Sequence, residues 1–131
     1  MDGLIITPLK RIAHPKGDIL HAIKETDPGF AGFGELYFTI IKYGEIKGWK
    51  KHNVMTMNLI VPEGTVRFYL RKELDTCHEI VIGRHNYVRL TISPKVWVAF
   101  EGCGNGLNLV ANLSNIPHDP NEAENVQWGL L

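Results

Sequence analysis

Short apolar runs separated by turn signals are the feature that most constrains the fold of this chain. Runs of roughly five residues, rich in β-branched and aromatic side chains, recur between clusters of Gly, Pro, Asn and Asp. We expect eight or nine strands, at residues 4–6, 19–23, 35–41, 55–61, 65–70, 79–82, 87–92, 96–100 and 107–113. No segment keeps a helical repeat, apart from a turn of helix expected near 120–126. The pattern therefore predicts an antiparallel β sandwich or barrel with little helix.

The tripeptide Pro62-Glu63-Gly64 connects two of these runs. Proline presets φ and glycine accepts a positive φ, so this stretch is typical of a tight turn. We therefore expect 55–61 and 65–70 to pair as a hairpin.

The length and charge of the chain limit what class of protein it is. A chain of 131 residues fits one domain, 1–131. Lys plus Arg and Asp plus Glu both total 14, so no net charge attracts the chain to nucleic acid or to an anionic membrane. The N-terminus is not typical of a signal peptide, and no window approaches the roughly 18 apolar residues of a membrane span. We therefore predict a cytoplasmic protein, with its two cysteines reduced.

Polar side chains within or between the apolar runs are candidates for a ligand site, because a barrel that holds a ligand needs some polar residues facing inward. They are Glu35, Tyr37, Lys50, His52, Thr56, Asn58, Arg67, Tyr69, Asn108 and Asn112. Every second residue of an antiparallel strand can also face water, so each candidate has an alternative interpretation as an outer residue.

The segment 48–52 concentrates the strongest of these candidates. Trp49, Lys50 and Lys51 precede His52, and imidazole is the usual general acid or base near neutral pH. Two cations and an indole beside it suit an anionic, ring-containing ligand. The alternative interpretation is a surface turn with a solvated basic cluster. The sequence contains no His-x-His, HExxH or paired CxxC, and so predicts no zinc or iron site.

Five stretches, in their order and spacing, resemble the cupin superfamily. Within it they resemble the dTDP-4-dehydrorhamnose 3,5-epimerase family and its relatives, the sugar-nucleotide 3,4-ketoisomerases. The stretches are PKGDILH at 15–21, GELYF at 34–38, IKGWKKH at 46–52, SPKVWVAF at 93–100 and PHDPNE at 117–122. The resemblance implies a cupin-type jelly-roll barrel, a homodimer, and a nucleotide-linked 4-keto-6-deoxy sugar, dTDP-linked, as ligand. It also implies that the protein works without metal or cofactor.

The same resemblance implies roles for particular residues. In the family a histidine removes a proton beside the ketone, and a tyrosine on the opposite side of the sugar returns one. Here Lys50 stands at the first histidine position, His52 keeps the second, and Asn112 falls near the tyrosine. Proton transfer is thus expected from His52 and Lys50, and binding from Lys16 at the phosphates and Glu35, Tyr37, Asn58 and Asn112 at the sugar or base. The ligand positions of metal-binding cupins carry Lys50, Met57 and Val98, which disfavours a metal.

Two functions stay open at this point. One is an epimerase or ketoisomerase with a rearranged catalytic set. The other is a non-catalytic sugar-nucleotide-binding cupin, a sensor or accessory protein that has lost the catalytic histidine and tyrosine. The direction of Lys50 and His52 tests the site itself, because side chains that both point to solvent would exclude it.

Overall fold

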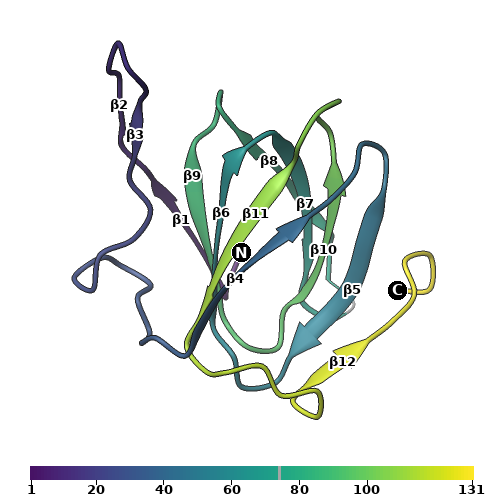
Figure 1. Cartoon of the computed structure of the whole chain (residues 1–131). Coiled ribbons are helices and arrows are strands. Elements are labelled where there is room, and N and C mark those ends of the chain that lie inside the picture. The colour runs from purple at the N-terminus through teal and green to yellow at the C-terminus, as the bar shows by residue number, and fades with distance from the viewer. Residues whose placement is uncertain (74) are drawn as a thin grey trace.

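The computed structural model describes residues 1–73 and 75–131. Its elements are all strands: β1 (Leu4–Pro8), β2 (Arg11–Ile12), β3 (Ile19–Leu20), β4 (Glu35–Ile40), β5 (Ile46–His52), β6 (Met57–Glu63), β7 (Thr65–Arg71), β8 (His78–Gly83), β9 (Val88–Ile92), β10 (Trp97–Gly102), β11 (Leu109–Ser114) and β12 (Ala123–Asn125). One five-stranded sheet has the order β1-β9-β6-β11-β4 and the other β12-β5-β10-β7-β8. The hairpin of β2 and β3 forms an arm that stands out from the barrel (Figure 1). Within the described residues, no helix has the length and apolar character to cross a membrane.

The strand pairs are nested along the chain. β7 pairs with β8, β6 with β9, β5 with β10 and β4 with β11, all antiparallel. Successive pairs belong to alternate sheets, so the chain winds as a double ribbon around the barrel. This is the jelly-roll arrangement, and the all-β fold class is confirmed.

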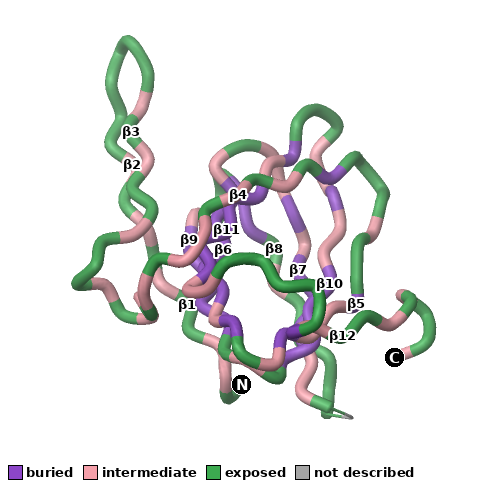
Figure 2. The backbone as a smooth tube through the Cα atoms, turned by 60° about the horizontal axis from the view of Figure 1, so that its bottom comes forward, coloured by how far each residue is buried: buried purple, intermediate pink, exposed green. Residues whose placement is uncertain are grey.

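The core fills the space between the two sheets. Residues with period two face inward, as Met57, Leu59 and Val61 do on β6, and Phe68 and Leu70 on β7. Figure 2 shows the buried stretches on the strands of the barrel, whereas the arm is mostly exposed. Part of the space between the sheets is left open as a cavity.

The expected hairpin between 55–61 and 65–70 is wrong. β6 pairs with β9 and β11, and β7 pairs with β8 and β10, so the two strands lie in different sheets. The turn predicted at Pro62–Gly64 is nevertheless present. Gly64 has φ +85°, and a Cβ there would come within 2.3 Å of the Leu107 carbonyl oxygen. Gly64 therefore turns the chain from one sheet to the other.

Two further differences concern the strands nearest the cavity. The turn of helix expected near 120–126 is instead β12, which pairs with the edge of β5. β5 is absent from the expected strands because its sequence does not alternate between apolar and polar residues. The structure explains this by a bulge, described below.

Candidate active site

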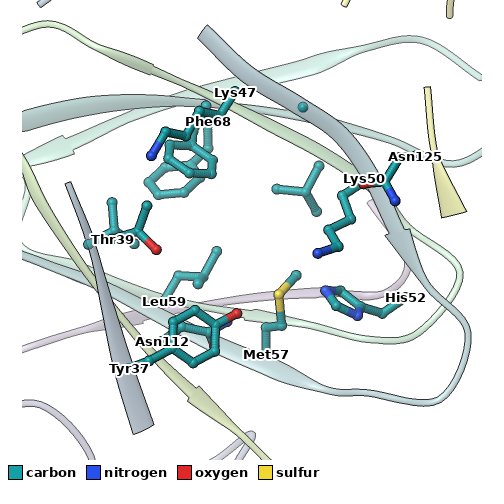
Figure 3. A pocket seen from close by; sticks show the side chains of 14 residues that line it. Tyr37, Thr39, Lys47, Lys50, His52, Met57, Leu59, Phe68, Asn112 and Asn125 are labelled. Carbon is teal, nitrogen blue, oxygen red and sulfur yellow. The ribbon is translucent and has the colours of Figure 1, made fainter. Parts of the chain in front are cut away.

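A cavity of about 330 Å³ opens between the two sheets. Its volume falls in the range of small-molecule sites. Residues of β4, β5, β6, β7, β10, β11 and β12 line it, and Figure 3 shows how they lie. The labelled lining residues are Tyr37, Thr39, Lys47, Lys50, His52, Met57, Leu59, Phe68, Asn112 and Asn125. The apolar floor and the few polar groups above it are typical of a ligand site.

A bulge in β5 brings the polar groups to one side. Val98 of β10 lies opposite Lys50 and Phe100 lies opposite Lys47, so β5 holds one extra residue between these pairs. Both lysines therefore line the cavity. Gly48 makes this possible: its φ is +131°, and a Cβ there would lie 2.6 Å from the Ala99 Cβ.

His52 forms a buried pair with Glu122 at the cavity wall. The Nδ1 atom of His52 hydrogen-bonds the Oε1 atom of Glu122, and both side chains are more than nine-tenths buried. The second carboxylate oxygen, Oε2, accepts the backbone N–H groups of Asn53, Val54 and Met55 at 3.0, 3.0 and 3.2 Å. The carboxylate is thus held by four donors.

These bonds keep Glu122 ionised. Burial alone raises the pKa of a carboxyl group, but the hydrogen bonds from His52 and from the Val54 and Met55 amides outweigh it. They lower the pKa of Glu122 from 4.5 to about 2. A carboxylate at Nδ1 fixes the tautomer of the ring, because it accepts the Nδ1–H and leaves Nε2 with the lone pair. The Glu122 carboxylate thus orients the His52 ring in the cavity wall.

Lys50 lies next to His52 on the same wall. Figure 3 shows its Nζ atom directed into the cavity. None of the ion pairs formed by the described residues includes Lys50. Lys47 also lines the cavity, and its Nζ donates to the Ile40 carbonyl oxygen at 2.8 Å. The cavity is consequently cationic on the β5 side.

Tyr37 and Asn112 form the opposite wall. They are direct cross-strand partners of β4 and β11, so their side chains share a face. The Asn112 Nδ2 atom donates to the Tyr37 hydroxyl at 2.8 Å. The Oδ1 atom of Asn112 is buried and has no hydrogen-bond partner among the described residues. This wall offers a phenol, and the Asn112 amide orients it.

The remaining expected site residues lie elsewhere. Lys16 is exposed in the turn of the β2–β3 arm, and its backbone N–H donates to His14. The Glu35 carboxylate accepts the His118 backbone N–H at 2.8 Å. Asn58 is buried on the other face of β6, where it contacts Gly29, Arg89 and Thr91. Within one chain the structure brings His52, Lys50, Tyr37 and Asn112 together, and not Lys16, Glu35 or Asn58.

Asn58 illustrates why strand alternation matters. Met57 and Leu59 face the cavity, so Asn58 between them faces outward. There it accepts a hydrogen bond from the fully buried Arg89, which also donates to the carbonyl oxygens of Ala22 and Pro28. Asn58 therefore helps to hold residues 22–29 against the outside of the first sheet.

The sequence interpretation missed Glu122, Lys47 and Thr39 as site residues. The stretch 117–122 carried a family signal, but nothing in it distinguishes Glu122 from a solvated acid in a polar tail. Within 1–73 and 75–131, no group of three or more His, Cys, Asp or Glu side chains is arranged to hold a metal ion.

Comparison with known proteins identifies the family. No family model matches the sequence, and no curated protein matches it. A solved structure of a dTDP sugar isomerase from Desulfovibrio desulfuricans is 33% identical, with a TM-score of 0.91, over 96% of this chain and 85% of that one.

Two more distant structures share the fold. The sugar 3,4-ketoisomerase QdtA from Thermoanaerobacterium thermosaccharolyticum, in complex with TDP, is 19% identical with a TM-score of 0.82, over 95% of this chain and 88% of that one. The dTDP-6-deoxy-D-glucose-3,5-epimerase RmlC from Legionella pneumophila is 14% identical with a TM-score of 0.83, over 98% and 74%. With a jelly-roll fold, a cavity between its sheets and 33% identity over nearly its whole length, the chain belongs to the dTDP-sugar isomerase family of cupins.

Proposed function

We propose that this protein is a cofactor-independent isomerase or epimerase that acts on a nucleotide-linked 4-keto-6-deoxy sugar in glycan biosynthesis. The observation that carries the proposal is the buried His52–Glu122 pair in the wall of a cavity that also holds Lys50. The relatives named above are a dTDP sugar isomerase, a ketoisomerase bound to TDP and a dTDP-sugar epimerase, which supports a dTDP-linked ligand.

His52 is the base in this proposal. Its Nε2 lone pair takes a proton from the carbon next to the C4 ketone, and the C–H electron pair moves to form an enolate with its charge on the ketone oxygen. The imidazolium that results is balanced by Glu122, whose lowered pKa keeps it a carboxylate. This use of a carboxylate to orient and stabilise a histidine base is widespread in enzymes.

Lys50 stabilises the enolate. A cation directed at the oxygen that gains charge lowers the barrier, and its effect is large in a site that excludes water. Lys50 suits this role because its Nζ is directed into the cavity beside His52. None of the ion pairs formed by the described residues includes it, so its charge is available to a ligand oxygen.

Tyr37 is the group that returns a proton from the opposite wall. Because its hydroxyl oxygen accepts the Asn112 N–H, its own O–H is left to donate to a ligand. A proton that Tyr37 adds to the opposite face of the same carbon inverts the configuration there, which is epimerisation. If His52 instead returns the proton to C4, and the proton of the C3 hydroxyl passes to the C4 oxygen, the ketone moves to C3, which is ketoisomerisation.

A homodimer completes the proposal. β4 is the edge of the first sheet, and its outward-facing side chains Leu36, Phe38 and Ile40 are 51–60% exposed. A row of apolar side chains on an edge strand suits burial against a second copy. In such an assembly Lys16, on the arm that stands out from the barrel, is available to the phosphates of a ligand in the partner's cavity.

Solvent exchange tests the enzyme. The protein is incubated in D₂O with TDP-4-keto-6-deoxyglucose, and the sugar is analysed by NMR. We expect deuterium at C3 or C5 with the wild type and with H85Q, a control in an exposed turn, and a loss of at least about 100-fold with H52Q. Binding of the sugar nucleotide without any exchange would instead support the non-catalytic binding protein.

A further inference from the structure

The C-terminal segment 122–131 contacts β5 from both of its faces. β12 adds to the edge of β5, with Ala123 opposite His52 and Asn125 opposite Lys50. Glu122, just before β12, reaches inward to His52, and Asn125 lines the cavity. Beyond β12 the chain continues along the outside of the barrel (Figure 1). The segment thus supplies a carboxylate to the cavity wall and is also attached to the barrel from outside, an attachment called the outer attachment below.

The outer attachment is aromatic. The ring of Trp128 stacks on that of Trp49, with centroids 5.2 Å apart and an interplanar angle of 20°. It also contacts Tyr69, with centroids 4.8 Å apart. Together with Val126 and Leu131 it covers a buried apolar cluster on the outer face of the second sheet. Aromatic pairs of this kind stabilise a fold by more than the burial of their apolar area alone.

The two attachments are linked through one short stretch of β5. Trp49 precedes Lys50 in the chain but points to the other face of the sheet. Its backbone exchanges two hydrogen bonds with Val126, at 2.7 and 3.0 Å. β12 itself is three residues long and lies at the edge of its sheet, so it has few bonds of its own. Short edge elements of this kind open locally unless side chains hold them.

We propose that Trp128 is a positioning residue for the His52–Glu122 pair: by stacking on Trp49 it keeps β12 on β5 and so keeps the Glu122 carboxylate on His52. Trp128 does not line the cavity and acts through the backbone of β12. Its catalytic meaning rests on the proposed function, whereas the placement of Glu122 can be measured without a substrate.

Hydrogen exchange followed by NMR tests the proposal. The reporters are the amide of Val54, which donates to Glu122 Oε2, and the amide of Val126, which donates to the Trp49 carbonyl oxygen. We expect W128A to speed exchange at both by roughly ten-fold or more, while the amide of Leu90 in the core stays protected. We also expect the Nδ1–H proton signal of His52 to weaken.

Two variants make the test specific. W128F keeps an aromatic ring and should restore most of the protection at Val54. L130A lies in the same segment but changes a side chain that is 74% exposed, and should behave as the wild type. Unchanged exchange in W128A, or acceleration that includes Leu90 equally, would overturn the proposal.

Measurements of activity separate the positioning role of Trp128 from the proposed function. If the protein is the proposed isomerase, W128A lowers kcat more than it raises KM, because the base rather than the binding wall is disturbed. A W128A effect on exchange in a protein that shows no turnover would leave the positioning role intact and remove the proposed function. The reverse outcome, normal exchange in an active enzyme, would remove only the role of Trp128.

Discussion

The Glu122 carboxylate hydrogen-bonds the Nδ1 atom of His52 from a position 70 residues further along the chain. It also accepts three backbone N–H groups from the residues that follow His52. One side chain therefore orients the histidine and anchors the turn after β5.

This pair predicts a pH dependence of stability. The pKa of Glu122 is about 2 in the folded chain and near 4.5 when it is released, so its stabilisation is complete above pH 5 and is lost as the pH falls from 4.5 towards 2. The difference in pKa corresponds to about 3 kcal/mol. We expect the free energies of unfolding of wild type and E122Q, measured by urea titration, to differ most above pH 5 and to converge near pH 2. E63Q, which changes an exposed acid, should show no such convergence; a constant gap for E122Q would contradict the assignment.

Replacement of Lys50 tests the stabilisation of the enolate. K50M replaces the cation beside His52 with an unbranched apolar side chain of similar size, so we expect kcat to fall by roughly 10²–10³-fold. Kinetics with TDP-4-keto-6-deoxyglucose measure this effect. K42M, at an exposed position outside the cavity, is the control. Near-normal turnover by K50M would show that the oxyanion is held by another group.

Replacement of Tyr37 separates proton removal from proton return. Y37F removes the hydroxyl that Asn112 orients but leaves His52 in place. If Tyr37 returns the proton, Y37F still exchanges the substrate C–H with D₂O but forms at least about ten-fold less inverted product. NMR of the sugar reports both quantities. Equal loss of exchange and product would make Tyr37 a binding residue, and Y43F, at an exposed tyrosine, controls for general effects.

The bulge in β5 leads to a prediction about stability. A Cβ at Gly48 would meet Ala99 and the Val98 carbonyl oxygen, and φ at Gly48 is +131°. We expect G48A to lower the free energy of unfolding by about 2–3 kcal/mol. G106A is the matched control, because a Cβ there meets nothing within 4 Å. If urea unfolding gives the two variants the same stability, the bulge is not constrained in this way.

The exposed side of β4 predicts the oligomeric state. We expect the wild type to sediment as a dimer and F38D to sediment as a monomer, because a buried carboxylate without a partner costs several kcal/mol. V81D changes an exposed apolar residue on the other sheet and should remain dimeric. Sedimentation velocity measures all three proteins, and a monomeric wild type would rule out the proposed assembly.

Local patterns of this sequence predict its strands better than its sheet partners. Apolar runs such as 87–92 fall where strands form, because burial and β-branched side chains act within a few residues. Partner choice depends on the whole winding of the chain, so the turn at Pro62–Gly64 is predictable from the sequence, whereas the hairpin expected across it does not form. β5 was missed because an extra residue at Gly48 breaks the alternation on which strand prediction depends.

In the candidate site, too, local sequence patterns were informative and contacts between distant segments were not predictable. His52 and Lys50 were identifiable because a histidine beside two lysines is chemically conspicuous in the sequence. Glu122 was not, because its role arises from β12 pairing with β5, a contact between distant segments. Arg89 lies in an apolar run and has the appearance of a solvated residue, yet it is fully buried. Its partners are two carbonyl oxygens, the Asn58 amide and the Asp27 carboxylate. All lie at least 31 residues earlier in the chain, so no local pattern of the sequence reveals them.

The nested strand pairs also have a consequence for the order in which the chain folds. Leu70 and His78, paired across β7 and β8, are eight residues apart in the sequence, whereas Tyr37 and Asn112, on the pair β4 and β11, are 75 residues apart. Closing a longer loop costs more entropy, so we expect the β7–β8 hairpin to form first and each outer pair to close around the one before it. Pulse-labelling hydrogen exchange during refolding can follow this sequence of events. Both walls of the cavity belong to the outer pairs, so ligand binding competence should be among the last properties the refolding chain acquires.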